Sequence, residues 1–585
     1  MPTNITFDKK LGISKGTSIV LPSGSSTAGP EMIFTITTTT ANETFQLGGN
    51  TGGGITYNYD IDWGDGTPIE NVTSNSKIHT YVTPGVHEIK LTGEIYIKSN
   101  TDASKWTEFK QWGSDVIIYG VREMFYNCQN MTYSATDAPN LSQMTSITYG
   151  IFYWMFRNCY SITSLDLTNW DVSTVTGQAT GCFQGMINLR YINISGWDMR
   201  NVTSHNTFMR NIGENSAGIG VDIVADDILF NANSTNWYQM FLQAKINSIS
   251  VRNWRLGATS ASVVQMWRDV GNSTGYTDKF NLDLSSWTNT STLGGLNMDS
   301  WCSSAKGMKT IDLTGWDLSN CTSFNSWFIN CSWLREIRGL DTLSLDSCTR
   351  LTSTFSGCRR LSFNNSNFSN TFLPNATCTS TAQTFYNCGD VLTGADLSVV
   401  PNTANWNMSA VTSVLNMFRD NIYRAGEVFT FNWNAPLLTS LYLAFYNTKG
   451  IAEINFSNAT LPALTDLTQM AQNCSQLERI VFGANCDFSG VSGMSNIASG
   501  CPLLNRLQFD SAVDFSSVTT MSGIAASTSV LQVSDYDLIL NRMAATNTNA
   551  VTMSFNNTNY TIAVSGAARS TLVGNGCTIT DAGGI

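Results

Sequence analysis

A short segment that recurs along most of the chain constrains its fold more than any other feature. Residues 155–177 read MFRNCYSITSLDLTNWDVSTVTG. Within them, Leu165-Asp166-Leu167 alternates apolar and polar residues, as a short half-buried strand does. The other apolar residues are spaced too irregularly for a long helix or a hairpin. Each copy is therefore expected to form one short strand and a return path.

Copies of this segment follow at nearly constant intervals. The closest are residues 301–323 and 183–204, and the steps from Phe156 to Phe183 and from Phe328 to Phe355 are both 27 residues. A unit this short cannot bury its own apolar face, so the period predicts a solenoid in which neighbouring copies stack. Further copies begin at Phe125, Phe208, Phe241, Trp267, Phe328, Phe355, Phe385, Phe418 and Phe445, and weaker ones at Ala471 and Ser499.

The composition fits such a stack. Charged residues make up 13% of the chain, against about 25% in an average soluble protein. Stacked copies place each side chain above its counterpart, where like charges repel but Ser, Thr and Asn can hydrogen-bond. The polar, uncharged composition is therefore attributed to stacking rather than to disorder.

The repeat resembles a known family. The run MFxxC followed by LxxLDLSxWDVSxVTS, over about residues 120–530, is similar to the BspA-type leucine-rich repeat of bacterial surface proteins. The resemblance implies a right-handed leucine-rich-repeat solenoid with a parallel sheet on one face, used for adhesion. The sequence departs from the pattern between Phe208 and Trp301 and between Phe355 and Phe431. Longer steps such as Trp267 to Trp301 predict loops inserted at one edge of the stack.

Residues 29–98 have a different pattern. Short alternating strands separated by turn residues predict a small antiparallel sandwich. The motif WGDGT at 63–67, with His79-Thr80-Tyr81 downstream, resembles a PKD domain, an immunoglobulin-like β-sandwich, and implies a spacer or presentation role. Asp60, Asp62 and Asp65 lack the spacing of an EF-hand calcium loop. We expect them to form a turn hydrogen-bonded to its own backbone.

The fold class is thus mainly β, a repeat solenoid preceded by a sandwich, in five parts. Residues 1–28 form either a flexible tail or an arm that orders on a partner subunit. The sandwich (29–98) is followed by an N-terminal cap (99–122), in which Trp106 and Trp112 cover the first rung, and by the solenoid (123–530). A C-terminal cap (531–585) should contain a helix near Asp535–Asn541, strand-like VTMSFNNTNYTIAV, a helix at Ala567–Leu572 and a strand at Cys577–Asp581. It resembles the segment that closes many BspA-type proteins.

The chain has 14 cysteines, and their positions favour packing over chemistry. Six of them lie three residues after the first residue of a copy, and Cys501 nearly so. A recurring position indicates a small buried side chain, although disulfides between successive rungs stay possible. Zinc is disfavoured because the chain has no CxxC pair and only His79, His87 and His205. The cysteines at the repeat position are Cys128, Cys159, Cys331, Cys358, Cys388 and Cys474.

Catalysis is not expected, nor is any cofactor or metal. Three histidines leave almost no general base for a Ser or Cys nucleophile, and no Gly-rich phosphate loop is present. Paired carboxylates would suit a glycan-cleaving tailspike, which stays as an alternative. The recurring carboxylates nevertheless occupy repeat positions where turn capping is the expected role: Asp166, Asp171, Asp198, Asp312 and Asp317.

Binding is the remaining role. The recurring tryptophans could form a ladder that stacks on sugars, but we expect them to pack in the core with each N–H on a backbone partner. A variable contact face is expected instead at 431–433 and in inserts around 212–236 and 268–280. The tryptophans are Trp170, Trp197, Trp254, Trp287, Trp316, Trp406 and Trp433.

Charge and the N-terminus set the expected location. The net charge of −11 disfavours nucleic acid, and no polybasic run suggests a membrane surface. The first residues lack the features of a secretory signal. We therefore expect a phage virion structural protein, a fibre, tail or capsid decoration subunit at the virion surface, displaying the repeat for host attachment. Its expected partners are other virion subunits, through the N-terminal arm, and a host surface protein or glycan; a homo-oligomer is compatible. The alternative is a bacterial cell-surface adhesin exported by a non-Sec route.

Overall fold

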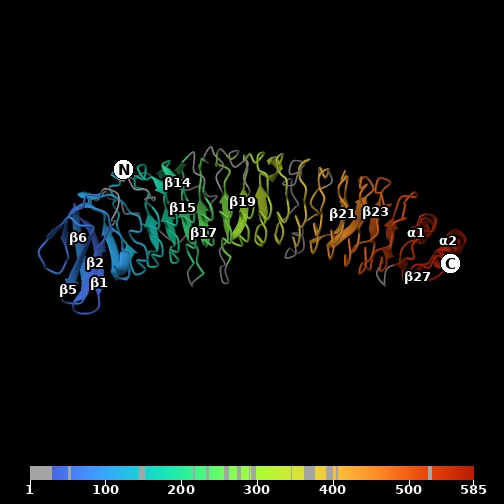
Figure 1. The fold of residues 1–585 in the computed structure, drawn as a ribbon, viewed down its shortest axis with the longest axis horizontal. Helices are drawn as coiled ribbons and strands as arrows, with labels where there is room; N and C mark the ends of the chain where they lie inside the picture. Colours follow the sequence, from blue (N-terminus) through green and yellow to red (C-terminus); the bar gives the residue numbers. More distant parts are fainter. Residues whose placement is uncertain are drawn as a thin grey trace, which may run out of the picture.

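The computed structural model shows an elongated rod, with a β-sandwich at one end and two helices at the other (Figure 1). The residues that it describes are those outside 1–28, 50–54, 144–151, 215–217, 232–235, 256–262, 273–278, 289, 291–297, 344, 362–375, 390–398, 404–405 and 525–529. The expected N-terminal arm and most of the expected inserted loops therefore lie outside the described residues.

The sandwich contains two antiparallel sheets. In the larger sheet β1 (Met32–Thr38) pairs with β6 (Gly85–Ile95), which pairs with β3 (Asn58–Asp62), and β3 pairs with β4 (Glu70–Val72). In the smaller sheet β2 (Glu43–Gly48) pairs with β5 (Ser76–Tyr81). The two sequence motifs meet in its core, where the Trp63 indole stacks on the His79 ring at 4.6 Å. The Tyr81 hydroxyl donates to the Trp63 carbonyl at 3.0 Å.

The larger sheet continues past residue 98 into the solenoid. The strand β7 (Trp106–Gln111) pairs with β1, β8 (Val116–Ile118) pairs with β6, and β9 (Thr132–Tyr133) pairs with β7. The boundary expected at residue 98 is therefore not a structural one. As predicted, Trp106 and Trp112 are buried, and each ring lies 6.0 Å from the ring of Phe125 in the first rung.

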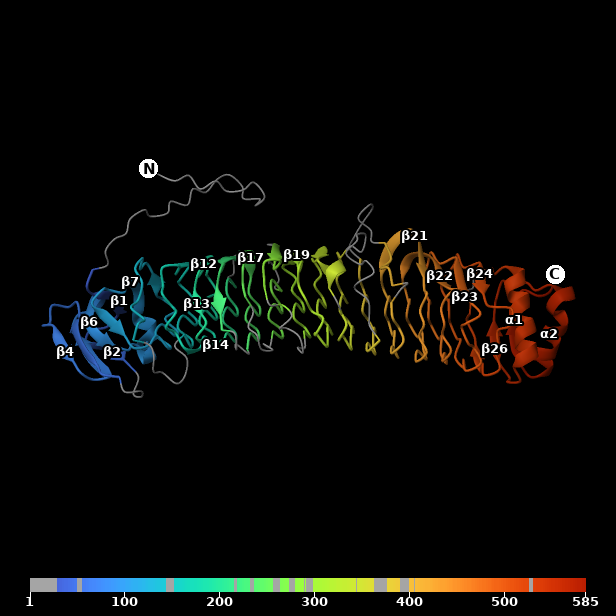
Figure 2. The same cartoon turned by 90° about the horizontal axis from the view of Figure 1, so that it is seen from above.

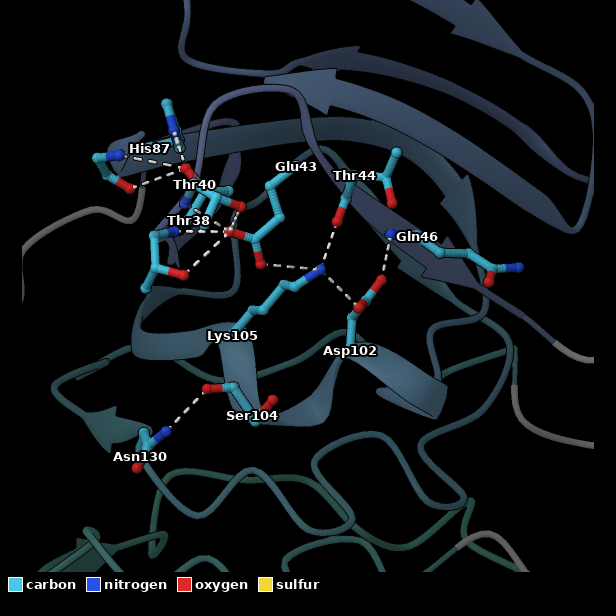
Figure 3. A network of polar contacts seen from close by, with 12 residues as sticks. Thr38, Thr40, Glu43, Thr44, Gln46, His87, Asp102, Ser104, Lys105 and Asn130 are labelled. Carbon is cyan, nitrogen blue, oxygen red and sulfur yellow. Dashed lines mark hydrogen bonds and ion pairs between the residues drawn. The ribbon is translucent and has the colours of Figure 1, made fainter. Parts of the chain in front are cut away.

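A polar network stabilises the junction between the sandwich and the solenoid (Figure 3). The ammonium group of Lys105, in the 3-10 helix η1 (Asn100–Lys105), lies 2.9 Å from Asp102 Oδ1 and 3.4 Å from Glu43 Oε1 of β2. It also donates to the Thr44 carbonyl. From the first rung, Asn130 donates its amide to the Ser104 carbonyl at 2.8 Å. The helix η1 is thus bound to the sandwich on one side and to the solenoid on the other.

The solenoid is a stack of about 16 turns with parallel sheets along it, as predicted (Figure 2). Apolar residues face inward at the same register, for example Leu165 opposite Ile192 and Ile311 opposite Ile337. The first sheet contains β10 (Ser164–Asp166), β12 (Tyr191–Asn193), β15 (Val221–Val224) and β17 (Ile246–Ser250). The second contains β18 (Phe280–Asp283), β19 (Met308–Asp312) and β20 (Glu336–Arg338), followed by η3 (Leu340–Thr342). The third contains β21 (Ile422–Thr430), β22 (Lys449–Phe456), β23 (Arg479–Phe482) and β24 (Arg506–Gln508).

Short strands pair elsewhere on the rungs. They are β11 (Gly177–Gln178) with β14 (Val202–Ser204), and β13 (Asp198–Met199) with β16 (Leu229–Phe230). A last parallel sheet contains β25 (Thr520–Met521), β26 (Thr552–Ser554) and β27 (Thr578–Thr580). Every rung thus contacts the next one through backbone hydrogen bonds at more than one point.

Tight turns form a second continuous feature, called the turn stack below. Within each turn, the central residue donates its backbone N–H to a carbonyl of the next rung, as from Phe156 to Cys182 at 2.8 Å. Within the described turns these bonds all point the same way, from the N–H of one rung to the C=O of the following rung. The central residues are Phe125, Phe156, Phe183, Met209, Phe241, Trp267, Cys302, Phe328, Phe355, Phe385, Phe418, Phe445, Ala471 and Ala498.

The turn stack corrects three predicted starting points by one residue. The copies expected at Phe208, Trp301 and Ser499 are centred on Met209, Cys302 and Ala498. The central residue and the one before it are both buried, so either position accepts the aromatic ring. The stack also continues through the expected departures, for example from Phe241 to Met266 at 2.9 Å and from Phe385 to Met417 at 3.0 Å.

Each turn holds its shape through left-handed backbone. Two residues four apart, flanking the central one, have φ near +57°, such as Asn158 with φ 63°. Glycine and asparagine adopt this conformation most easily, and asparagine is the commonest residue at these positions. At four of them a glycine lies over an asparagine of the preceding rung, as Gly185 does over Asn158.

The C-terminal cap differs in part from its prediction. The first helix, α1 (Val533–Thr546), is longer than expected. The second, α2 (Ile562–Gly574), begins inside the segment expected to be a strand, of which only β26 is extended. Helix formers Ala563, Ala567 and Ala568 favour this outcome over the β-branched residues around them. The last strand is β27, as expected.

Candidate binding surfaces

The cysteines expected to be packing residues are all buried. At the recurrent position, the thiol donates to a carbonyl in the turn of the preceding rung, as from Cys358 Sγ to Phe328 O at 3.1 Å and from Cys474 Sγ to Phe445 O at 3.0 Å. Thr448 occupies the same position and donates to the Phe418 carbonyl at 2.6 Å. Burial raises the pKa of Cys331 to about 12, which leaves such a thiol unreactive at neutral pH.

The seven recurring tryptophans lie in the core, as expected, and form no exposed ladder. Five of the seven indole N–H groups donate to carbonyls of the preceding rung, for example from Trp197 to Leu167 at 2.8 Å and from Trp316 to Leu284 at 2.9 Å. The expected backbone partner is absent for Trp170 and Trp406, whose buried Nε1 atoms have no hydrogen-bond partner among the residues that the structure describes. Their rings stack on one another, with Trp287 and Trp316 centroids 5.8 Å apart. They stabilise the stack rather than bind a ligand.

The recurring carboxylates cap turns, as predicted. Asp166 and Asp171 each accept a backbone N–H two residues later, at 3.2 and 3.0 Å, and Asp312 and Asp317 do the same. In the sandwich, burial alone would raise the pKa of Asp65, but hydrogen bonds from Thr67 and His79 lower it to about 2. These carboxylates are therefore engaged in local structure.

The segments expected to vary and to bind are only partly surface features. Phe431 and Trp433 are buried, so the expected contact face at 431–433 is wrong. Residues 212–236 hold β15 and β16 and form a regular rung where they are described. Of 268–280, residues 273–278 lie outside the described part. The third histidine, His205, is also buried, and burial lowers its pKa to about 3.

An aromatic cluster with two arginines lies on the turn stack near the sandwich. The Trp154 ring lies 5.3 Å from Tyr126 and 4.4 Å from Tyr153. The guanidinium of Arg157 lies over Trp154 at 4.2 Å, and that of Arg122 lies over Tyr153 at 4.7 Å. All five side chains are partly exposed. We call these five residues the first turn cluster.

A second turn cluster occupies corresponding positions near the other end. It consists of Leu415, Arg419, Tyr442, Leu443 and Tyr446. Arg419 lies over the Tyr446 ring at 4.7 Å. Leu415 and Tyr442 are exposed by 39% and 36%. Because the positions correspond, both clusters lie along the same line of turns.

Both clusters carry an unusual backbone feature. Trp154 has φ 57° and Leu443 has φ 55°. The left-handed conformation costs a residue with a side chain about 1–2 kcal/mol, and bulky residues there are outliers. Elsewhere in the described turns, these positions hold small or polar residues. Such strain concentrates at functional sites in proteins, so these two positions are the best candidates for binding.

The sequence contains a signal for the clusters at a position outside the recurring apolar pattern. In the two relevant copies, the residues before the central Phe read YWM and YLA. Their counterparts in other copies contain Gln, Ser, Asn, Thr, Glu or Gly at the middle position. Knowledge that this position needs a left-handed backbone would have marked Trp154 and Leu443 as exceptions.

Two kinds of site are absent from the described residues. None of the helices there has both the length and the apolar character needed to cross a bilayer. No group of three or more His, Cys, Asp or Glu side chains in that part of the chain is arranged to hold a metal ion.

Comparison with known proteins identifies the repeat. Four overlapping segments, residues 150–277, 235–368, 296–427 and 379–506, match a family model described as "Mycoplasma protein of unknown function, DUF285". No curated protein matches the chain. The matched segments together run from residue 150 to residue 506, more than half of the sequence. The chain therefore belongs to the DUF285 family.

Proposed function

We propose that this chain is a non-enzymatic attachment protein whose solenoid binds a surface receptor through the two turn clusters. One observation carries the proposal: the bulky residues Trp154 and Leu443 occupy strained positions beside partly exposed aromatic and arginine side chains, near both ends of one line of turns. Exposed Tyr, Trp and Arg are the residues that contribute most to binding at protein surfaces. A rod that presents two such clusters suits attachment at two points.

The proposal extends to the type of each domain. The solenoid is taken as a BspA-type leucine-rich repeat, and the sandwich as a PKD-like spacer. The network around Lys105 and the sheet shared by β1, β7 and β9 support a spacer that holds the solenoid at a fixed angle. Rigid presentation lowers the entropic cost of binding.

The second part of the proposal concerns the carrier, meaning the particle or cell surface on which the protein is displayed. The first candidate is a virus particle, in which the chain is a fibre, tail or decoration subunit joined to its neighbours through residues 1–28. A bacterial cell surface is the second candidate, favoured by the description of the matched family as Mycoplasma proteins. Labelling with antibodies against the sandwich, in purified particles and in cell envelopes, distinguishes the two carriers.

The binding role is tested by substitutions that relieve strain. Trp154→Asn and Leu443→Asn place a residue that tolerates left-handed backbone in each cluster. Each variant should have a stability close to that of the wild type, because removal of about 1–2 kcal/mol of strain offsets the lost contacts of the bulky side chain. Binding of the fluorescent protein to host cells should fall severalfold in each variant and further in the double variant.

A matched control uses Ser300→Asn, which introduces the same residue at a corresponding left-handed position outside the clusters, where φ is 58°. Its binding should equal that of the wild type. Double-variant protein that binds cells as well as the wild type would refute the role of the clusters. Release of reducing ends from host polysaccharide by the purified protein would contradict the non-enzymatic assignment.

A further inference from the structure

A group of cations gathers around Trp333 in the middle of the solenoid, at the edge where each rung leaves the turn stack and enters the second sheet. We propose that this edge binds an anionic glycan, a polysaccharide bearing sulfate or carboxylate groups. The group consists of Lys279, Lys309, Arg335 and Arg360 with Trp333, and is called the cationic edge below. It shares no residue with the turn clusters, so it can be tested separately from them.

Trp333 fixes two of these cations. The guanidinium carbon of Arg360 lies 3.7 Å from the centroid of the indole, and the ammonium nitrogen of Lys279 lies 4.9 Å from it. Both distances are in the range of cation–π attraction. These residues come from three different rungs, and Trp333 itself is partly exposed. The ring thus holds two positive groups close together at the surface before any ligand arrives.

Two more cations extend this pair along the stack. Lys309 and Arg335 occupy the same position in successive rungs, joined by a hydrogen bond from Arg335 N to Lys309 O at 2.9 Å. Both side chains are exposed. Neither they nor Arg360 form an ion pair with a carboxylate among the residues that the structure describes. Their charges are therefore available to a ligand.

At the C-terminal ends of the strands of the same sheet, positive charge is paired with carboxylates of the chain itself. There Arg338 lies 3.1 Å from Glu336 and 3.9 Å from Asp312. The exposed cations Lys309 and Arg335 thus lie at the upstream edge of the sheet, within a chain of net charge −11. Stacking places like charges above one another, which is unfavourable without a counter-charge. A polyanion lying along the edge would supply that counter-charge.

The arrangement favours a glycan over a nucleic acid. Proteins that bind single strands offer open aromatic faces on which bases stack, whereas Arg360 covers a face of Trp333. Duplex binding relies on many phosphate contacts on both sides of a wide helix, more than the four cations of this narrow edge can supply. Successive rungs repeat about every 4.8 Å, which is comparable to the length of one sugar along an extended polysaccharide. Regularly spaced sulfates or carboxylates can therefore meet successive cations.

The experiment measures binding of the full chain to heparin, polygalacturonate, neutral dextran and duplex DNA. Heparin or polygalacturonate should bind, with an affinity that falls as salt increases, and dextran should not. The double variant Lys309→Ser/Arg335→Ser should bind the anionic glycan about tenfold more weakly. Its slope of log affinity against log salt should decrease by about one unit for each cation removed.

The matched control is Arg190→Ser, because Arg190 occupies the position of Lys309 and Arg335 in a distant rung. It should leave glycan binding unchanged. Trp333→Leu keeps an apolar residue but releases Arg360 and Lys279, and should also weaken binding. Duplex DNA that binds as tightly as the glycans, or a double variant that binds glycan like Arg190→Ser protein, would overturn the inference. Cell binding that persists while no anionic glycan binds would overturn it and leave the attachment function standing, whereas loss of both would overturn both.

Discussion

From the second rung onward, each cysteine at the recurrent position acts as a small hydrogen-bond donor inside the core. Its thiol reaches a turn carbonyl of the preceding rung at about the same distance in rung after rung, 3.0 Å for Cys159 and 3.0 Å for Cys388. Thr448 shows that a hydroxyl can replace the thiol. The position therefore selects for a small donor, and redox chemistry is not needed to explain it.

Two isosteric substitutions at Cys358 test this role. Threonine and valine have nearly the same shape, and only threonine can donate to the Phe328 carbonyl. Cys358→Val should therefore be less stable than Cys358→Thr by about 1 kcal/mol. The midpoint of urea unfolding measures the difference. Equal midpoints would show that only the volume of the side chain matters.

At the scale of the element, the contact between adjacent rungs restricts the glycines of the third sheet. Gly450 in β22 and Gly426 in β21 both have positive φ, 88° and 87°. A Cβ on Gly450 would overlap the carbonyl oxygen of Tyr423 in the rung below, whereas one on Gly426 would meet nothing within 4 Å. The same substitution thus faces different surroundings at the two positions.

Alanine at each glycine separates backbone strain from rung contact. Both variants pay the cost of left-handed backbone, about 1–2 kcal/mol. Gly450→Ala should lose roughly 1–3 kcal/mol more, because β21 and β22 must move apart. Thermal unfolding followed by circular dichroism compares them. Similar melting temperatures for the two variants would mean that the rungs separate easily.

The predictable and unpredictable parts of these elements have different physical causes. The period of the repeat predicts the solenoid, and the recurrence of Cys and Trp predicts their burial, because every rung solves the same packing problem. The one-residue errors at Phe208, Trp301 and Ser499 arose because two adjacent buried positions accept the same residues. The cationic edge escaped prediction because its members are far apart in sequence, and only stacking brings Lys279 and Arg360 to the same ring.

At the scale of the whole molecule, the rod depends on the junction between sandwich and solenoid. Removal of the Lys105 charge leaves Glu43 and Asp102 without their shared cation. Lys105→Met should therefore destabilise the junction by roughly 1–3 kcal/mol. Amide hydrogen exchange should become faster in β2 and η1 while β21–β24 keep their protection.

A suitable control for this measurement is Lys77→Met. Lys77 pairs with Glu70 at the surface of the sandwich, where its side chain is 37% exposed. Exposed pairs contribute little to stability, so exchange in β2 and η1 should match the wild type. Unchanged exchange in Lys105→Met protein as well would show that the shared sheet alone holds the junction.

The common direction of the hydrogen bonds in the turn stack gives the rod a polarity. No rung precedes the first turn, so no earlier turn can donate to its carbonyls. The hydroxyl groups of the preceding segment do so instead: that of Ser99 donates to Tyr126 O at 2.6 Å and that of Tyr96 to Arg122 O at 3.4 Å. During synthesis, the backbone N–H groups of the most recently folded turn have no acceptor until the ribosome has made the next rung. Synthesis from the N-terminus therefore adds rungs to a stack whose first end is capped. The other end has unpaired backbone N–H groups until the next rung is added. The N–H groups of that growing end would pair with the turn carbonyls of another copy if its own next rung were delayed.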